Sequence, residues 1–138
     1  MLRVVLDPVV MLRGLLNPYS LCGRLLFEYA DRYRAVFSDN TLRVLRLLLL
    51  HPVIVVRLPA LVKISPSRLA RLFQCAERVR VPTEPDVNLH VALARAARAD
   101  YLICEDQTLL SQCQDHGIPV LNTRAFLALL DPDLFLPT

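Results

Sequence analysis

The stretch that decides the fold is Glu84-Pro-Asp-Val-Asn-Leu-His-Val-Ala-Leu-Ala-Arg-Ala-Ala-Arg-Ala-Asp-Tyr-Leu-Ile-Cys-Glu-Asp106. Its first part predicts a helix over residues 83–98, because acidic residues stand in the first turn and apolar residues follow at helical spacing. The apolar residues 101–104 then predict a short buried strand, which ends at the acidic pair Glu105 and Asp106. A helix that leads directly into a buried strand is typical of parallel α/β sheets.

The start of the chain repeats the pattern of a buried strand that ends at an acid. Residues 2–6 form an apolar run with a single arginine, and this run ends at Asp7-Pro8, where the proline stops the strand. In open parallel sheets, sites lie outside the carboxyl ends of the strands, near a topological switch point. We therefore expect Asp7 and Asp106 to lie at one edge of the sheet. Each acid also suits a purely local role, as the cap of the turn or helix that follows it.

The rest of the chain alternates between helical and strand-like patterns. Helices are predicted at Ser20–Tyr33, at 66–78, from Asp106 or Thr108 to His116, and at 123–130 with Thr123 as the cap. A further helix is predicted through Leu42, Leu45, Leu48 and Leu49, with Ser38, Asp39 or Asn40 as its cap and His51-Pro52 as its end. Strands are predicted at 35–37, 79–81 and 118–121. Residues 53–64 stay undecided between a strand and a turn into a short helix. The alternation predicts one domain over residues 1–138, a three-layer α/β/α sandwich with a mostly parallel central sheet.

Composition excludes several classes of protein. The chain has 138 residues, of which 54% are hydrophobic and 21% charged, enough for one core. The longest clean apolar run, Leu47–Leu50, is far shorter than the ~20 residues that span a bilayer. Asp7 interrupts the N-terminus before an apolar signal segment could form, so we expect a cytoplasmic protein. The four cysteines include no pair at two-residue spacing, and we interpret them as small core residues.

The charge balance permits a nucleic-acid partner without requiring one. The net charge is +3, and every basic residue except Lys63 is an arginine. Arginine favours planar contacts with phosphate or carboxylate groups. Solvated helix faces explain the same composition equally well.

Four stretches together resemble the PIN domain, specifically the bacterial group of toxin components of toxin–antitoxin systems. Residues 3–18 are similar to the family's first strand and its D-T-N-V-L-V-S-G-L-L, and Phe37-Ser38 with the leucine-rich helix is similar to the second strand and the glutamate-bearing helix. Residues 84–106 are similar, without a gap, to D-P-D-D-N-K-F-L-x-x-A-L-A-x-x-A-D-Y-L-V-T-G-D, and residues 106–110 and 117–127 complete the likeness. The resemblance spans nearly the whole chain.

This resemblance implies a Mg²⁺- or Mn²⁺-dependent ribonuclease in which several carboxylates hold metal at the strand ends. Hard divalent cations prefer oxygen ligands, and the metal both activates a water and neutralises charge on the phosphate. The resemblance also implies an antitoxin protein as partner, RNA as substrate, and often a homodimer. Asp7 and Asp106 match the family's first and last acids.

Two of the four family acids are replaced. The glutamate position on the second long helix falls at Val44, and the third aspartate position falls at Val87. The pair that follows the first acid in the family, Thr-Asn, is Pro8-Val9 here, which removes groups that would orient Asp7. The resemblance therefore implies a weakened or inactive site.

Three functional hypotheses remain open. The first is a PIN-like protein with a weakened or dead active site. The second is a protein- or RNA-interaction module, with the leucines and valines of the helix after Ser38 as its interface. The third is an active Mg²⁺ or Mn²⁺ ribonuclease with rearranged ligands, in which Asp86 joins Asp7 and Asp106; Glu84 and Glu105 are weaker candidates for the same substitution.

Overall fold

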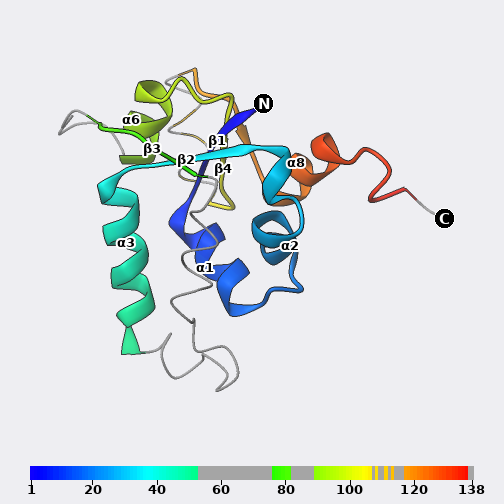
Figure 1. Cartoon of the computed structure of the whole chain (residues 1–138), viewed down its shortest axis with the longest axis horizontal. Coiled ribbons are helices and arrows are strands. Elements are labelled where there is room, and N and C mark those ends of the chain that lie inside the picture. The colour runs from blue at the N-terminus through cyan, green and yellow to red at the C-terminus, as the bar shows by residue number, and fades with distance from the viewer. Residues whose placement is uncertain are drawn as a thin grey trace.

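The computed structural model describes residues 1–52, 76–81, 89–106, 108, 111, 113 and 117–136. Its centre is a five-stranded parallel sheet composed of β1 (Arg3–Leu6), β2 (Arg34–Phe37), β3 (Glu77–Arg78), β4 (Tyr101–Ile103) and β5 (Val120–Leu121). The helices in the described residues are α1 (Pro8–Leu16), α2 (Leu21–Phe27), α3 (Asp39–Leu50), α6 (Leu89–Ala96) and α8 (Thr123–Leu130). The predicted three-layer α/β fold with a parallel sheet is confirmed (Figure 1).

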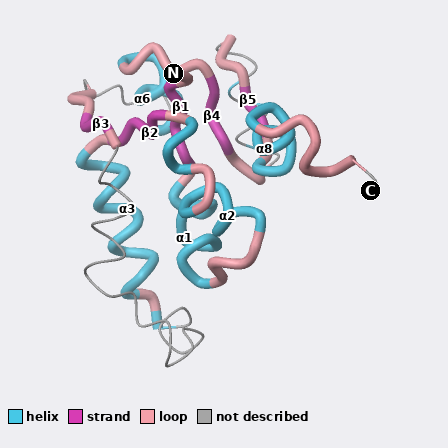
Figure 2. Tube along the Cα trace, turned by 45° about the vertical axis from the view of Figure 1, so that its right-hand side comes forward, coloured by secondary structure: helices cyan, strands magenta, loops and turns pink. Residues whose placement is uncertain are grey.

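The strand order, β3-β2-β1-β4-β5, places the topological switch point between β1 and β4. After β1 the chain builds the sheet in one direction through β2 and β3, and it then returns to the other side of β1 to add β4 and β5 (Figure 2). Connections therefore leave the carboxyl ends of β1 and β4 in opposite directions. A ligand site in such a sheet is expected between these two strand ends.

Alternate residues of each strand fill two cores, one on each face of the sheet. Val4, Leu6 and Ile103 face a cluster formed with α1, α2, α8 and the buried Leu45 of α3. Val5 and Leu102 face the other side, where α6 covers them. This alternation follows from the two-residue repeat of a strand, and burial of both faces explains why these strands read as continuous apolar runs.

Helix α1 occupies a segment for which the sequence predicted no helix. Asp7 is its N-cap, and an Asp7 carboxylate oxygen accepts a hydrogen bond from the Val9 amide at 3.3 Å. Pro8 is the first helical residue, where its missing N–H has no consequence and its fixed φ favours the helix. The proline that was interpreted only as a strand terminator therefore also begins a helix.

Helix α2 is shorter than predicted and ends at Phe27 instead of Tyr33. A 3₁₀ turn, Ala30–Arg32, follows it. The Tyr33 hydroxyl donates to the Leu25 carbonyl at 2.8 Å, and its ring packs edge-on against Phe126 with centroids 5.6 Å apart. Packing of this tyrosine beneath α2 ends the helix earlier than the apolar spacing suggests.

Helix α3 follows the prediction closely. Ser38 and Thr41 form a capping box: the Ser38 hydroxyl accepts from the Thr41 amide at 3.3 Å, and the Ser38 amide donates to the Thr41 hydroxyl at 3.2 Å. His51 is the C-cap, just before Pro52. Across the described parts of the chain no helix is long and apolar enough to cross a membrane, and α3, the longest, has 12 residues.

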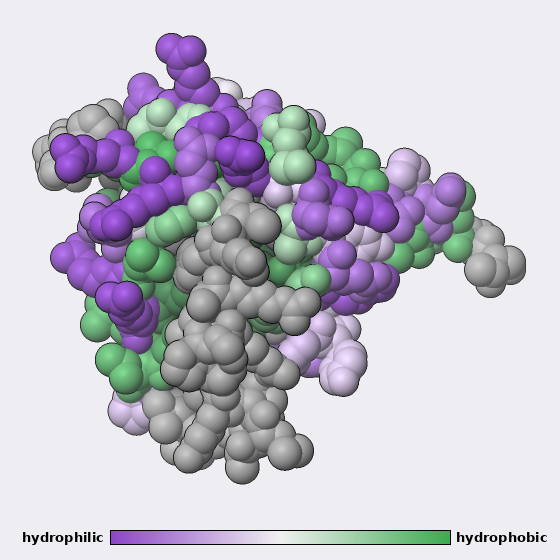
Figure 3. Space-filling model, viewed as in Figure 1, coloured by the Kyte–Doolittle hydropathy of each residue, from purple (hydrophilic) through white to green (hydrophobic). Residues whose placement is uncertain are grey.

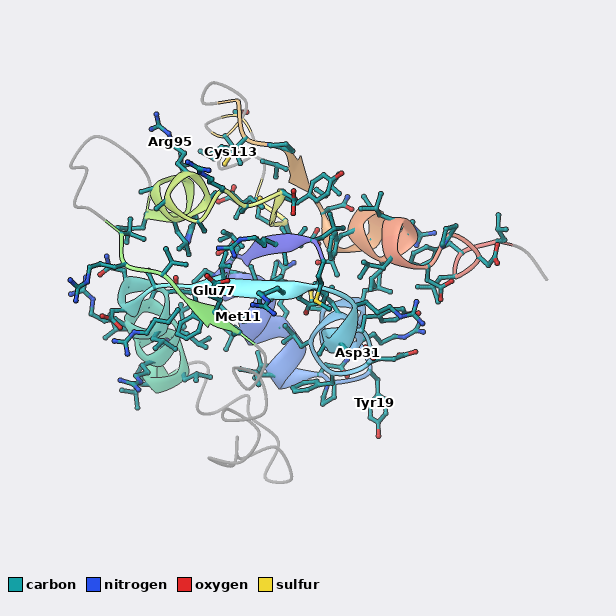
Figure 4. The ribbon with its side chains drawn as sticks, turned by 45° about the horizontal axis from the view of Figure 1, so that its top comes forward. Met11, Tyr19, Asp31, Glu77, Arg95 and Cys113 are labelled. Atoms are coloured by element: carbon teal, nitrogen blue, oxygen red, sulfur yellow. The ribbon has the colours of Figure 1, made fainter. Side chains whose placement is uncertain are left out.

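Several other predicted boundaries are wrong. The strand expected at 79–81 is β3 at Glu77–Arg78, so residues 77 and 78, which were predicted to end a helix, are in a strand. Figure 4 labels Glu77 on this polar edge strand. The Arg3 guanidinium holds the Glu77 carboxylate with two hydrogen bonds of 2.7 and 3.2 Å and so fixes the strand. The cap of α8 is Asn122 instead of Thr123, because the Asn122 side chain accepts from the Ala125 amide at 2.7 Å. Strand β5 has only two of the four residues predicted.

Several predictions lie outside the described residues. They are the undecided segment 53–64, most of the helix at 66–78, the first turns of the helix at 83–98, and most of the helix from Asp106 or Thr108 to His116.

The close approach of Gly23 in α2 to the turn that follows α1 yields a stability prediction. A Cβ atom at this position would lie 2.4 Å from the backbone C and O atoms of Pro18, which cannot move aside as a flexible side chain would. We expect Gly23→Ala to lower the free energy of unfolding by about 3 kcal/mol, the upper end of typical overpacking costs. Urea denaturation measures the change.

Gly117→Ala is the matched control. Its Cβ would meet no atom within 4 Å, although its φ of +70° carries the left-handed penalty of about 1 kcal/mol. A Gly23→Ala loss no larger than that of Gly117→Ala would contradict the predicted close contact.

Candidate functional site at the carboxyl ends of strands β1 and β4

Asp7 lies at the switch point of the sheet. It directly follows β1, and its backbone amide donates to the Ile103 carbonyl of β4 at 3.0 Å, so the first residue after β1 is tied to the last residue of β4. The residue is only 7% exposed. Its carboxylate is thus held in a partly desolvated position at the edge where ligands of parallel sheets bind.

Asp106 lies at the same edge, three residues beyond the end of β4. Its side chain is exposed and accepts a hydrogen bond from the Thr108 amide at 2.9 Å. Its negative charge is close enough to raise the pKa of Asp7. The structure therefore brings together the two acids that the sequence singled out, although 98 residues lie between them.

His90 of α6 is the partner of Asp7. Its Nε2 atom lies 3.7 Å from a carboxylate oxygen of Asp7, and both side chains are largely buried, at 16% and 10% exposure. The sequence patterns assign His90 no role, so this contact was not predicted. The register of α6 against β1 brings His90 to Asp7, and no local pattern in the sequence reports that register.

Burial dominates the electrostatics of this pair. It raises the pKa of Asp7, and the charge of Asp106 adds to this effect, whereas His90, the Val9 amide and Arg13 oppose it. Burial also lowers the pKa of His90, and the negative charge of Asp7 opposes that shift. Each partner thus favours the charged form of the other in a setting that disfavours both charges.

The residues between β4 and Asp106 have structural roles. The Cys104 thiol is fully buried, donates to the Asp106 carbonyl at 3.7 Å, and has its pKa raised by burial, so it stays a protonated thiol. Glu105 accepts a hydrogen bond from the Thr123 amide at 2.9 Å and so joins the end of β4 to the start of α8. The expectation that Cys22, Cys104 and Cys113 are small buried residues is confirmed.

The other positions that the sequence analysis considered for the metal site add no acid to it among the described residues. Val44 lies half-buried on α3, six residues beyond the capping serine. Glu84, Asp86 and Val87 lie outside the described residues. Whether Asp86 reaches this edge therefore stays a prediction.

The donor set decides how well a divalent metal fits the edge. Within the described ranges no group of three or more histidine, cysteine, aspartate or glutamate side chains is arranged to hold a metal ion. Asp7 and Asp106 offer two carboxylates, and the first already faces an imidazole. These residues alone do not form a resident metal site, although Mg²⁺ can bind through one or two carboxylates when waters and substrate phosphates complete its shell.

The contact between Asp7 and His90 can be tested by substitution. We expect Asp7→Asn to lower the pKa of His90, because the negative charge that opposes the effect of burial is removed. The histidine would then lose its proton at lower pH than in the unsubstituted protein. Titration of the imidazole C–H resonances by NMR measures the shift, after assignment with His90→Gln.

Asp133→Asn, a substitution in the segment after α8, is the control and should leave the His90 titration unchanged. A pKa of His90 that is unchanged or raised in Asp7→Asn would mean that the two side chains do not interact as described.

Comparison of the chain with models of protein families finds no match, and no curated protein matches it either.

Proposed function

We propose that the chain is a PIN-like protein related to Mg²⁺- and Mn²⁺-dependent ribonucleases, of the toxin-component type, whose active site is weakened or inactive. One observation carries this proposal: Asp7 and Asp106 follow β1 and β4, the two strands that flank the switch point of a β3-β2-β1-β4-β5 parallel sheet. The resemblance of residues 3–18, 84–110 and 117–127 to the family also supports it.

The same geometry argues against full activity. Four carboxylates would offer about four negative charges to the metal, whereas Asp7 and Asp106 offer about half of that. The Asp7 carboxylate is already occupied by the Val9 amide and by His90. Loss of a group that orients a ligand costs about 10- to 100-fold, and loss of an acid–base group costs about 10²- to 10⁴-fold. Several such losses together leave little cleavage.

A second candidate function, an interaction module, is favoured by the surface of α3. Leu47 and Leu50 are 63% and 74% exposed, and hydrophobic side chains gather over this end of the helix (Figure 3). A module of this kind would bind an antitoxin protein or form a homodimer through that face. Light scattering that shows a monomer for both the unsubstituted chain and Leu47→Gln/Leu50→Gln would count against the homodimer.

The third candidate, an active enzyme with rearranged ligands, depends on Asp86. Anomalous scattering from crystals soaked in Mn²⁺ separates it from the proposal, because it requires a metal ion bound jointly by Asp7, Asp106 and Asp86.

A cleavage assay tests the main proposal. We expect the purified protein to cleave neither single-stranded nor structured RNA appreciably with Mn²⁺ or Mg²⁺, because half of the family's acids are absent. Labelled RNA resolved on denaturing gels measures the rate, and Asp7→Ala sets the background from contaminating nucleases.

Robust cleavage that Asp7→Ala abolishes, and that the surface substitution Asp133→Ala leaves intact, would overturn the weakened-site proposal. Cleavage at the same low rate in all three proteins agrees with it.

A further inference from the structure

A pocket opens beside the edge of the sheet where Asp7 and Asp106 lie, on the side of β5. Its volume is about 630 Å³. It lies where the last turn of α1 and the start of α2 meet the residues that follow β4 and β5. Its walls include Arg13, Leu16 and Leu21 from the two helices, and Glu105, Asn122 and Arg124 from the residues after β4 and β5. Glu105 precedes Asp106 directly, so the pocket adjoins the candidate site.

Two arginines give the pocket rim a positive charge. Arg13, exposed on α1, forms no ion pair with any residue in the described part of the chain. Arg13 lies on α1, the helix that is capped by Asp7, and it lines the pocket. Its charge lowers the pKa of Asp7 and of Cys22 in the pocket wall. The Arg124 guanidinium stacks on the Phe135 ring, with its central carbon 4.2 Å from the ring centroid. Stacking orients a guanidinium while its in-plane N–H groups remain able to donate to an anion.

The wall between these arginines is apolar, with amide groups beside it. Leu16 and Leu21 are half-buried, and Cys22 is buried. The side-chain oxygens of Asn17 and Asn122 accept from the backbone amides of Tyr19, at 3.1 Å, and Ala125, at 2.7 Å. These bonds fix both side chains and leave their NH₂ groups as donors. An apolar wall with a few fixed polar groups is typical of a small-molecule subsite.

Glu105 adds one acceptor to this otherwise basic rim. One of its oxygens accepts from the Thr123 amide at 2.9 Å, and the other forms no hydrogen bond within the described residues. A carboxylate oxygen at this position can accept from a hydroxyl group. The pocket thus combines donors for phosphate, an apolar surface for a ring, and an acceptor for a ribose hydroxyl.

We propose that this pocket binds one nucleotide of single-stranded RNA, with flanking phosphates on Arg13 and Arg124 and the base against Leu16 and Leu21. Arginines bind phosphate through paired N–H donors, and single-stranded RNA is recognised by pairing such contacts with surfaces for splayed bases and with contacts to the 2′-hydroxyl. The proposal deepens the proposed function and rests on it for the choice of RNA.

Fluorescence anisotropy with a labelled octauridylate in EDTA tests the pocket without any cleavage. We expect Arg13→Gln and Arg124→Gln each to weaken binding by about tenfold or more, the usual effect of losing a charge-assisted hydrogen bond. Arg43→Gln is the matched control, because Arg43 is exposed on α3 and its guanidinium donates to Asn40, one turn earlier on the same helix. It should bind within about twofold of the unsubstituted chain, since a remote surface charge contributes little at physiological salt.

Thermal unfolding checks that the arginine variants remain folded. Arg13→Lys keeps the charge, so its affinity for the RNA should lie between those of Arg13→Gln and the unsubstituted chain. Equal binding by the unsubstituted chain, Arg13→Gln and Arg124→Gln would overturn the proposal, as would an equal loss in Arg43→Gln. Competition by polyglutamate or by octadeoxyuridylate as strong as that by unlabelled octauridylate would overturn the choice of RNA.

The outcome is distinguishable from that of the proposed function. Binding is measured without metal, so a failure here leaves the cleavage assay and its Asp7→Ala comparison unaffected. Conversely, robust cleavage would overturn the weakened site while leaving the arginine contacts to be judged by anisotropy.

Discussion

The pairing of β1 with β4 is the constraint on which the rest of the structure depends. These strands are nearly a hundred residues apart in sequence, yet they form the centre of the sheet, and the Asp7 amide extends their ladder by one more bond to the Ile103 carbonyl. Every residue of the candidate edge takes its place from this junction. Asp7 leaves β1 there, Asp106 follows β4, and Glu105 reaches across to α8. Burial of Val5 and Leu102 beneath α6 holds the junction from the other face.

The same burial that secures the junction shapes its chemistry. A carboxylate with 7% exposure loses most of its hydration, and the imidazole of His90 replaces part of it. A partner already in place competes with any cation that would use the same oxygen. The Asp7 site is therefore built more as an internal contact between β1 and α6 than as an open metal ligand, whereas Asp106 remains exposed to solvent.

The local signals in the sequence account for the strands and capped helices, and the failures have specific causes. Buried parallel strands such as β1 and β4 are visible as apolar runs, and α3 is visible because three possible caps, Ser38, Asp39 and Asn40, precede leucines at helical spacing. The structure selects Ser38 among them. Helix α1 was missed because Pro8 was interpreted only as the end of a strand and Asp7 as the possible cap of a turn, although an N-cap followed by a first-turn proline predicts a helix equally well. The meeting of Asp7 and Asp106 followed from topology alone, but the approach of His90 depends on how α6 seats on the sheet, which no local pattern reports.

The acids that remain at the edge are those that also bond the backbone. Asp7 accepts the Val9 amide at the start of α1, and Asp106 accepts the Thr108 amide. A capping carboxylate stabilises a helix start by about 1 kcal/mol whether or not it takes part in chemistry. Under the proposed function, capping would therefore favour Asp7 and Asp106 in an inactive protein as well as in an active enzyme. An acid at position 44 would have no such capping role, because Ser38 already caps the helix on which Val44 lies. The two aspartates therefore support the proposed topology of this edge but not its activity. The valine at position 44 is the residue that supports a weakened site.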